Sequence, residues 1–80
     1  MDKKTINKVW NKYQKNEDNN DHSENVVLLA KTFGNDEDVA EAEDIQHKHD
    51  SIGYMTTDLL KRRDVLHNKF YPILVSFRKL

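Results

Sequence analysis

Apolar residues recur every seven positions along the C-terminal half of this chain. The repeat runs without interruption through Ile45, Ile52, Leu59, Leu66, Ile73 and Leu80. A seven-residue apolar repeat is typical of a helix whose apolar face is covered by other helices. The pattern therefore predicts a long C-terminal helix around which the rest of the chain is arranged.

Two shorter helical patterns precede this repeat. Residues 3–15 place apolar side chains at i, i+3, i+4 and i+7, which predicts a helix with one buried stripe. Residues 16–22 contain no apolar side chain, so they are expected to form a loop. A strongly apolar run then predicts a second helix over 23–33. Ser23 is its expected N-cap, and Gly34 is expected to end it in the left-handed conformation.

The third helix is expected over 36–70, capped by Asn35 or Asp36. Pro72 is expected to stop or kink it near Phe70, leaving a short helical segment at 73–79. Gly53 could break the long helix, with Asp50 or Ser51, or Thr56 or Thr57, capping a fourth helix. Because the seven-residue repeat continues across Gly53, we expect one continuous or gently bent helix.

These elements predict an all-α fold: a small helical bundle of three to four helices with a long, heptad-patterned C-terminal helix. The 80 residues are expected to form a single domain, 1–80. With 36% hydrophobic residues the core is small, so stability from a partner or from homo-oligomerisation is also expected.

Charge is divided into three blocks, although the formal net charge is −1. Residues 1–16 are basic, residues 17–50 are acidic, and residues 51–80 are basic again. This order predicts that the acidic middle packs beside both ends. The alternative is that the acidic middle presents a charged face to an outside partner.

Two basic residues in the last block have expected partners. Asp58 and Arg62 have the spacing of an intrahelical ion pair. Arg63 lies in the apolar seam, where its stem could cover the core. Alternatively, Arg63 pairs with an acidic residue from 36–44 and fixes the helix register.

Signals for catalysis or cofactor binding are absent from the sequence. There is no cysteine, and with two glycines there is no glycine-rich phosphate loop. The serines also lack the glycines of a nucleophile elbow. We therefore expect no enzyme activity, no catalytic residue and no cofactor.

One group of residues has the spacing of metal ligands. Glu43, His47 and Asp50 share one helix face, and His22 or His67 could supply a fourth ligand. An exposed polar face with ordinary ion pairing is the favoured interpretation, so no metal site is predicted.

The apolar seam is longer than two short helices can cover, which indicates a protein partner or a second copy of the chain. Val65 and Val75 are expected to be exposed or covered by the partner, as are the apolar members of the predicted protein-binding set. That set consists of Leu66, Phe70, Leu74, Phe77, Arg62 and Arg63.

The expected function is non-enzymatic protein binding or regulation, as in small inhibitors and adaptors, including those that phages or mobile elements encode. The alternative is a nucleic-acid-binding accessory protein that uses the basic residues of the C-terminal helix. No segment approaches the roughly 20 apolar residues of a membrane span, and no secretory signal precedes residue 16. A cytoplasmic location without membrane contact is therefore expected.

Overall fold

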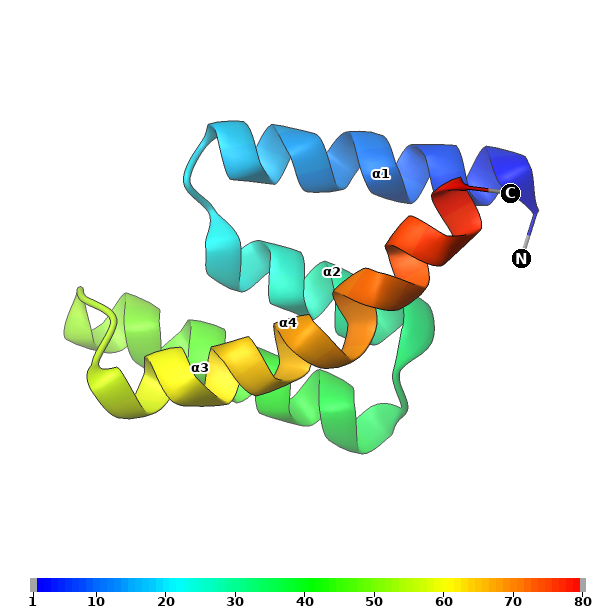
Figure 1. Ribbon diagram of the computed structural model, residues 1–80. Helices are drawn as coiled ribbons and strands as arrows, with labels where there is room; N and C mark the ends of the chain where they lie inside the picture. The colour runs from blue at the N-terminus through cyan, green and yellow to red at the C-terminus, as the bar shows by residue number, and fades with distance from the viewer. Residues whose placement is uncertain (1, 80) are drawn as a thin grey trace.

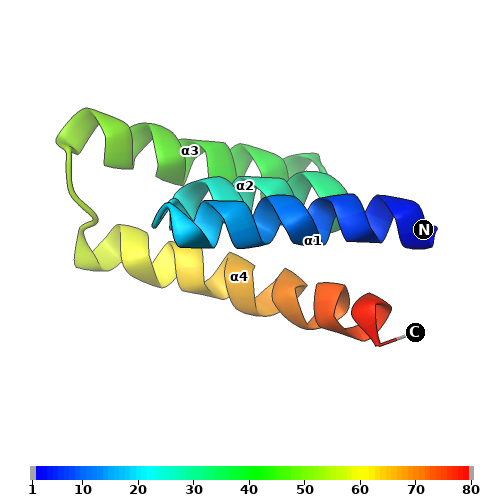
Figure 2. The same cartoon turned by 90° about the horizontal axis from the view of Figure 1, so that it is seen from above.

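The computed structural model describes residues 2–79, which form four α-helices connected by short turns. Their bounds are α1 Lys3–Asp18, α2 His22–Phe33, α3 Asp36–Ile52 and α4 Thr57–Arg78. Helix α2 is central and contacts α1, α3 and α4, whereas α1 and α3 lie on opposite sides of it (Figure 1). Seen from above, α1 lies over α2, and α3 and α4 flank the pair (Figure 2). The predicted all-α bundle is confirmed.

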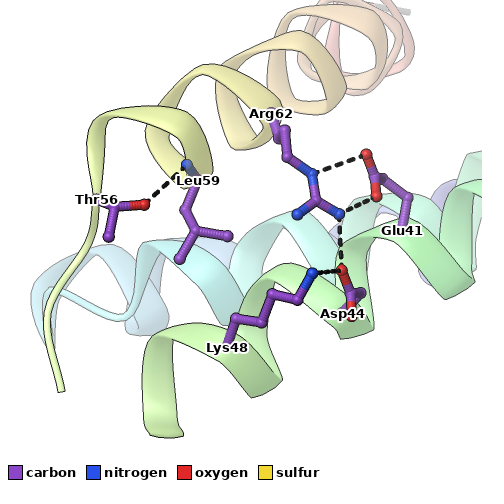
Figure 3. A network of polar contacts seen from close by, with 6 residues as sticks. All are labelled: Glu41, Asp44, Lys48, Thr56, Leu59 and Arg62. Atoms are coloured by element: carbon purple, nitrogen blue, oxygen red, sulfur yellow. Dashed lines mark hydrogen bonds and ion pairs between the residues drawn. The ribbon is translucent and has the colours of Figure 1, made fainter. Parts of the chain in front are cut away.

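The C-terminal half of the chain is a helical hairpin, so the prediction of one helix over 36–70 is wrong. Gly53 adopts a left-handed conformation with φ of 89° and ends α3, its N–H donating to the His49 carbonyl at 2.8 Å. Thr56 then caps α4, because its hydroxyl accepts from the Leu59 N–H at 3.2 Å (Figure 3). Glycine adopts this backbone conformation at little cost, which lets the chain reverse here.

The hairpin also changes how the apolar repeat is used. Leu59 and Leu66 are buried, but Ile52 is 46% exposed and Ile73 is 37% exposed. A strict seven-residue repeat drifts around a straight helix by about 20° per heptad, so it does not keep one face inward without supercoiling. The last member, Leu80, lies outside the described residues.

Of the two outcomes expected at Pro72, the stop is wrong, because α4 continues to Arg78 and residues 73–78 are its last turns, whereas the kink is confirmed. The helix bends in its orange segment, and its red C-terminal turns approach α1 (Figure 1). Proline removes one backbone hydrogen bond and its ring displaces the preceding turn, which explains the bend. The bend keeps the C-terminal apolar residues in contact with α1 and α2.

The turn between α2 and α3 is tight for a steric reason. Gly34 has φ of −95° and ψ of −179°, which is extended backbone rather than the expected left-handed conformation. A Cβ atom at Gly34 would lie 2.8 Å from both the Phe70 ring and the Asp38 Cβ. Asn35 then caps α3 as predicted, in a reciprocal capping box with Asp38.

The start of α2 also differs from the prediction. Ser23 lies inside the helix and is buried, and Asp21 occupies the N-cap position without a side-chain capping bond. The Ser23 hydroxyl is instead 3.3 Å from Nδ1 of His49 on α3. The Ser23 side chain therefore links α2 to α3, and this contact gives the buried hydroxyl a hydrogen-bond partner.

Every helix contributes to one hydrophobic core, and α2 and α4 contribute most, with four buried apolar residues each. The buried apolar residues are Ile6, Tyr13, Val26, Val27, Leu29, Ala30, Ala42, Ile45, Leu59, Leu66, Phe70 and Leu74.

Substituting Gly34 by Ala should destabilise the fold, because the added methyl group must displace the Phe70 ring or the backbone. We expect the free energy of unfolding to fall by about 2 kcal/mol, as in other overpacked cores. Urea denaturation followed by circular dichroism measures the change. Lys31→Ala, an exposed substitution on α2, should stay within about 0.5 kcal/mol of the wild type. A Gly34→Ala protein as stable as the wild type would contradict the tight turn.

Candidate interaction surface and polar pocket

The structure places three of the six predicted protein-binding residues in the core. Leu66, Phe70 and Leu74 are 5%, 2% and 0% exposed, so the chain's own helices cover them. The expectation that Phe70 and Leu74 are exposed is therefore wrong. Phe77 is half-buried and stacks on Phe33 of α2, with ring centroids 5.9 Å apart. The hairpin shortens the seam, and this removes the need for an outside cover.

The remaining apolar residues do not form one surface stripe. Val65 is 68% exposed, as expected, and Val75 is half-buried. Leu60 and Val65 project from different sides of α4, because five residues correspond to about 140° around a helix. Exposed apolar residues that are scattered singly are ordinary in a folded protein.

Arg62 joins the two arms of the hairpin. Its guanidinium donates to Glu41 through Nε, at 3.2 Å, and through Nη2, which also donates to Asp44 at 2.8 Å (Figure 3). Lys48 pairs with the same Asp44 at 3.1 Å. Arg62 thus pairs across the hairpin and not, as predicted, with Asp58. The acidic residues on α3 that were expected to pair with Arg63 pair with Arg62 instead.

These contacts lower the pKa values of the acidic residues on α3. Hydrogen bonds from Arg62 hold the pKa of Glu41 below its ordinary value, against the opposing effect of burial. Hydrogen bonds from Arg62 and then Lys48 lower the pKa of Asp44. The backbone N–H of Asn35 and the Lys69 ammonium lower the pKa of Asp38. The acidic middle of the sequence therefore packs against the basic C-terminal helix, as predicted.

The basic N-terminal helix has no such acidic cover. Within the described residues α1 does not contact α3, because α2 lies between them. The acidic middle segment therefore does lie beside both ends, as predicted, but it meets α1 through α2, whereas its acidic residues on α3 lie beside α4 only. The bundle carries a basic helix and an acidic helix on opposite sides.

The exposed lysines of α1 form a stripe, which we call the lysine face. Lys4, Lys8, Lys12 and Lys15 follow i, i+4, i+8 and i+11, are all exposed, and enter no ion pair with any residue in 2–79. Like charges at i, i+4 are unfavourable by a few tenths of a kcal/mol each. The first turn of α1 also holds no acidic residue, although acids are favoured at that end of a helix.

The acidic face of α3 differs in having a local explanation. Asp36, Glu37 and Asp38 occupy the first turn of α3, where the helix dipole favours negative charge. Glu41, Asp44 and Asp38 are further stabilised by Arg62, Lys48 and Lys69. In the lysine face only Lys15 lies in the last turn, where the helix dipole favours positive charge, and Lys4, Lys8 and Lys12 have neither a favourable dipole nor an ion-pair partner among the described residues.

A small open pocket lies where the end of α1, the start of α2 and the middle of α4 meet. Its volume is about 250 Å³, and it is lined by Tyr13, Glu17, His22, Arg63, Asp64 and His67. The Tyr13 hydroxyl is 2.8 Å from Nε2 of His67, and Nδ1 of His22 is 3.2 Å from Oε1 of Glu17. Two histidines that sequence analysis considered as metal ligands thus line one pocket.

A buried amide network supports this pocket from behind. The Asn25 side chain is fully buried and donates to the Tyr13 carbonyl at 3.0 Å and to the Glu17 carboxylate at 2.9 Å. It accepts from the amide of Asn16 at 3.0 Å. Burial raises the pKa of Glu17, but the hydrogen bonds from Asn25 and His22 outweigh it, so the pKa is lowered. Glu17 is therefore held ionised in a fixed position.

Aromatic rings form the neighbouring wall between α1 and α4. Tyr13 stacks on Trp10 at 6.0 Å and on Tyr71 at 5.4 Å, and His67 stacks on Tyr71 at 5.0 Å. Burial, followed by the negative charge of Glu17, raises the pKa of Tyr13 well above its usual range, so its hydroxyl stays protonated. The Arg78 guanidinium lies over the Trp10 ring, with its Cζ 4.7 Å from the ring centroid, and covers the solvent side of this aromatic group.

The candidate metal ligands Glu43, His47 and Asp50 are all exposed on α3. Across residues 2–79 no group of three or more histidine and carboxylate side chains is arranged to hold a metal ion. His22 and His67, considered as a fourth ligand, lie in the pocket instead.

Sequence analysis identified neither the pocket nor the lysine face as a site. The signals available were the polar run that contains Glu17 and His22, and the lysines at helical spacing on α1. Neither signal indicates which residues of α4 come to lie beside α1.

Comparison with protein-family models, with curated proteins and with solved structures returned no match. Among the described helices, none combines the length and the apolar character that crossing a bilayer requires.

Replacing Arg62 by Gln should reduce stability in a pH-dependent way. Because Glu41 and Asp44 have lowered pKa values, their contribution is complete above their ordinary values of 4.5 and 3.8 and is lost as pH falls through the lowered values. We expect a loss of about 1 kcal/mol at pH 7, as for a partly exposed ion pair, and a smaller loss at acidic pH. Chemical denaturation across this pH range measures it.

Arg63→Gln on the same helix is the matched control, because among residues 2–79 Arg63 enters no ion pair. It should change stability little and equally at each pH. An Arg62→Gln effect that is independent of pH would contradict the proposed contribution of the two carboxylates.

Proposed function

We propose that this protein is a non-enzymatic binding protein that docks the lysine face of α1 on an acidic surface of a protein partner. The observation that carries the proposal is the placement of Lys4, Lys8, Lys12 and Lys15 on one exposed stripe, where none of them enters an ion pair with a described residue. A helix that keeps like charges in register gains nothing from them in the free protein. An acidic partner would supply the counter-charge that these lysines lack within the bundle.

The burial of the apolar residues of α4 also favours a binding surface made of charged residues. Leu66, Phe70 and Leu74 serve the core, so the large surfaces left for a partner are the charged faces of α1 and α3. Charge complementarity raises association rates and selects among partners, even where each exposed pair adds little affinity. A protein that covers a partner's acidic surface in this way would act as a regulator or inhibitor.

The alternative, nucleic-acid binding through α4, has less support. Arg62 and Lys69 are paired with Glu41, Asp44 and Asp38, so these cations are already neutralised within the bundle. The lysine face itself contains no arginine, the residue whose planar guanidinium binds phosphate in a bidentate manner. A protein surface rich in carboxylates is the better match for a row of lysine ammonium groups.

The test compares two triple variants with the same change in net charge. In one, Lys8, Lys12 and Lys15 on the lysine face become Gln; in the other, Lys31, Lys48 and Lys61 elsewhere become Gln. Binding to fluorescent poly-L-glutamate is measured by anisotropy at several salt concentrations. The first variant should bind about tenfold more weakly than the wild type, from roughly 0.5 kcal/mol per lysine.

The second variant should bind nearly as the wild type does. Equal losses in the two variants would mean that net charge alone matters and would reject the lysine face. An oligonucleotide of equal charge serves as the competing ligand. If it bound to α1 more tightly than polyglutamate at the same salt concentration, the nucleic-acid alternative would replace this proposal.

A further inference from the structure

The pocket between α1, α2 and α4 contains charged groups of both signs that the fold leaves without a partner. Arg63 and Asp64 are adjacent in sequence and both line the pocket, yet neither enters a hydrogen bond or ion pair with another described residue. Glu17 uses Oε1 for both Asn25 and His22, which leaves Oε2 available. The pocket thus offers one cationic and two anionic groups.

We propose that this pocket binds a small zwitterionic molecule of the α-amino acid class, with its carboxylate on Arg63 and its ammonium group on Asp64 and Glu17. This site is separate from the lysine face and does not depend on the proposed function. A simple anion would meet the two carboxylates, and a simple cation would meet Arg63. A ligand that carries both charges pairs with each of these groups.

The buried hydrogen-bond network around Asn25 is better explained by a binding site than by a purely structural role. Asn25 is fully buried, and its amide serves the Tyr13 carbonyl, the Glu17 carboxylate and Asn16, all at or behind the pocket wall. Buried polar networks often contribute no more stability than apolar residues of the same size. What this network does provide is a fixed Glu17 carboxylate, and fixed groups reduce the entropy lost when a ligand binds.

Size and shape restrict the ligand. A volume of about 250 Å³ is just below the range of roughly 300 Å³ and upwards typical of pockets for drug-sized molecules. Tyr13 and His67, whose side chains are hydrogen-bonded to each other, both line the pocket, and the His67 ring is held by its stacking on Tyr71. Room therefore exists for a backbone-like zwitterion with a short side chain.

The first experiment titrates the ¹⁵N-labelled full chain with L-alanine and follows the Arg63 side-chain N–H and the His67 ring by NMR. We expect saturable shifts confined to the pocket, with a dissociation constant on the order of 1 mM. Propionate lacks the amine of alanine, and ethylamine lacks its carboxylate. Each of these halves should bind at least about tenfold more weakly than alanine, because one charged hydrogen-bonded contact is lost.

Variants then assign the two ends of the ligand. Arg63→Gln should abolish the preference for alanine over ethylamine, and Asp64→Asn should reduce its preference over propionate. Lys61→Gln and Asp58→Asn, on the same helix but outside the pocket lining, should leave binding unchanged. Circular dichroism confirms that each variant is folded.

Three results would overturn the proposal. The first is the absence of saturable chemical-shift changes at the pocket with alanine. The others are propionate binding as tightly as alanine, which would indicate an anion site, and ethylamine binding as tightly as alanine, which would indicate a cation site. Because polyglutamate binding by the lysine face is measured separately, failure of one proposal leaves the other intact.

Discussion

The burial of α2 on several sides is the constraint on which the rest of this structure depends. Leu29, Ala30 and Asn25 have no exposed surface, and Val26 and Val27 are nearly as buried. The packing of α1, α3 and α4 around this one short helix therefore contributes a large part of the stabilisation from apolar burial. The same arrangement separates α1 from α3, and so it separates the lysine face from the acidic face. Charge segregation is in this sense a consequence of the core.

The hairpin at Gly53 is the second requirement, because α2 needs cover from two directions. A continuous helix over 36–70 could pass α2 only once, with the far half of its apolar seam in water. Reversal at Gly53 brings Ile45 of α3 and Leu59 of α4 into the same core, and Arg62 then links the two arms through Glu41 and Asp44. The exposed positions of Ile52 beside the turn and Ile73 near the bend show where the repeat no longer faces the core.

Much of the local structure could be predicted from the sequence, because it depends on neighbouring residues. The spacing of Ile6 and Tyr13 indicates α1, and Asn35 was correctly expected to cap α3. At Gly53 the helix propensity and the apolar repeat favour opposite outcomes, and the sequence does not show which of the two contributes more. Gly34 was correctly placed at a helix end, but for the wrong reason. Its small size matters because Phe70, distant in sequence, lies against it.

The pocket and the lysine face could not be predicted because both depend on how α1 sits on α2. That geometry is set by Asn25, whose amide contacts the Tyr13 carbonyl and the Glu17 carboxylate of α1. An apolar residue at this position could fill the same volume, but it would not prefer one register of α1 over the next, since apolar contacts are not directional. Hydrogen bonds with defined partners do distinguish registers. The buried stripe of Ile6 and Tyr13 fixes the side of α1 that faces inward, and the amide of Asn25 then selects the register of α1 along α2.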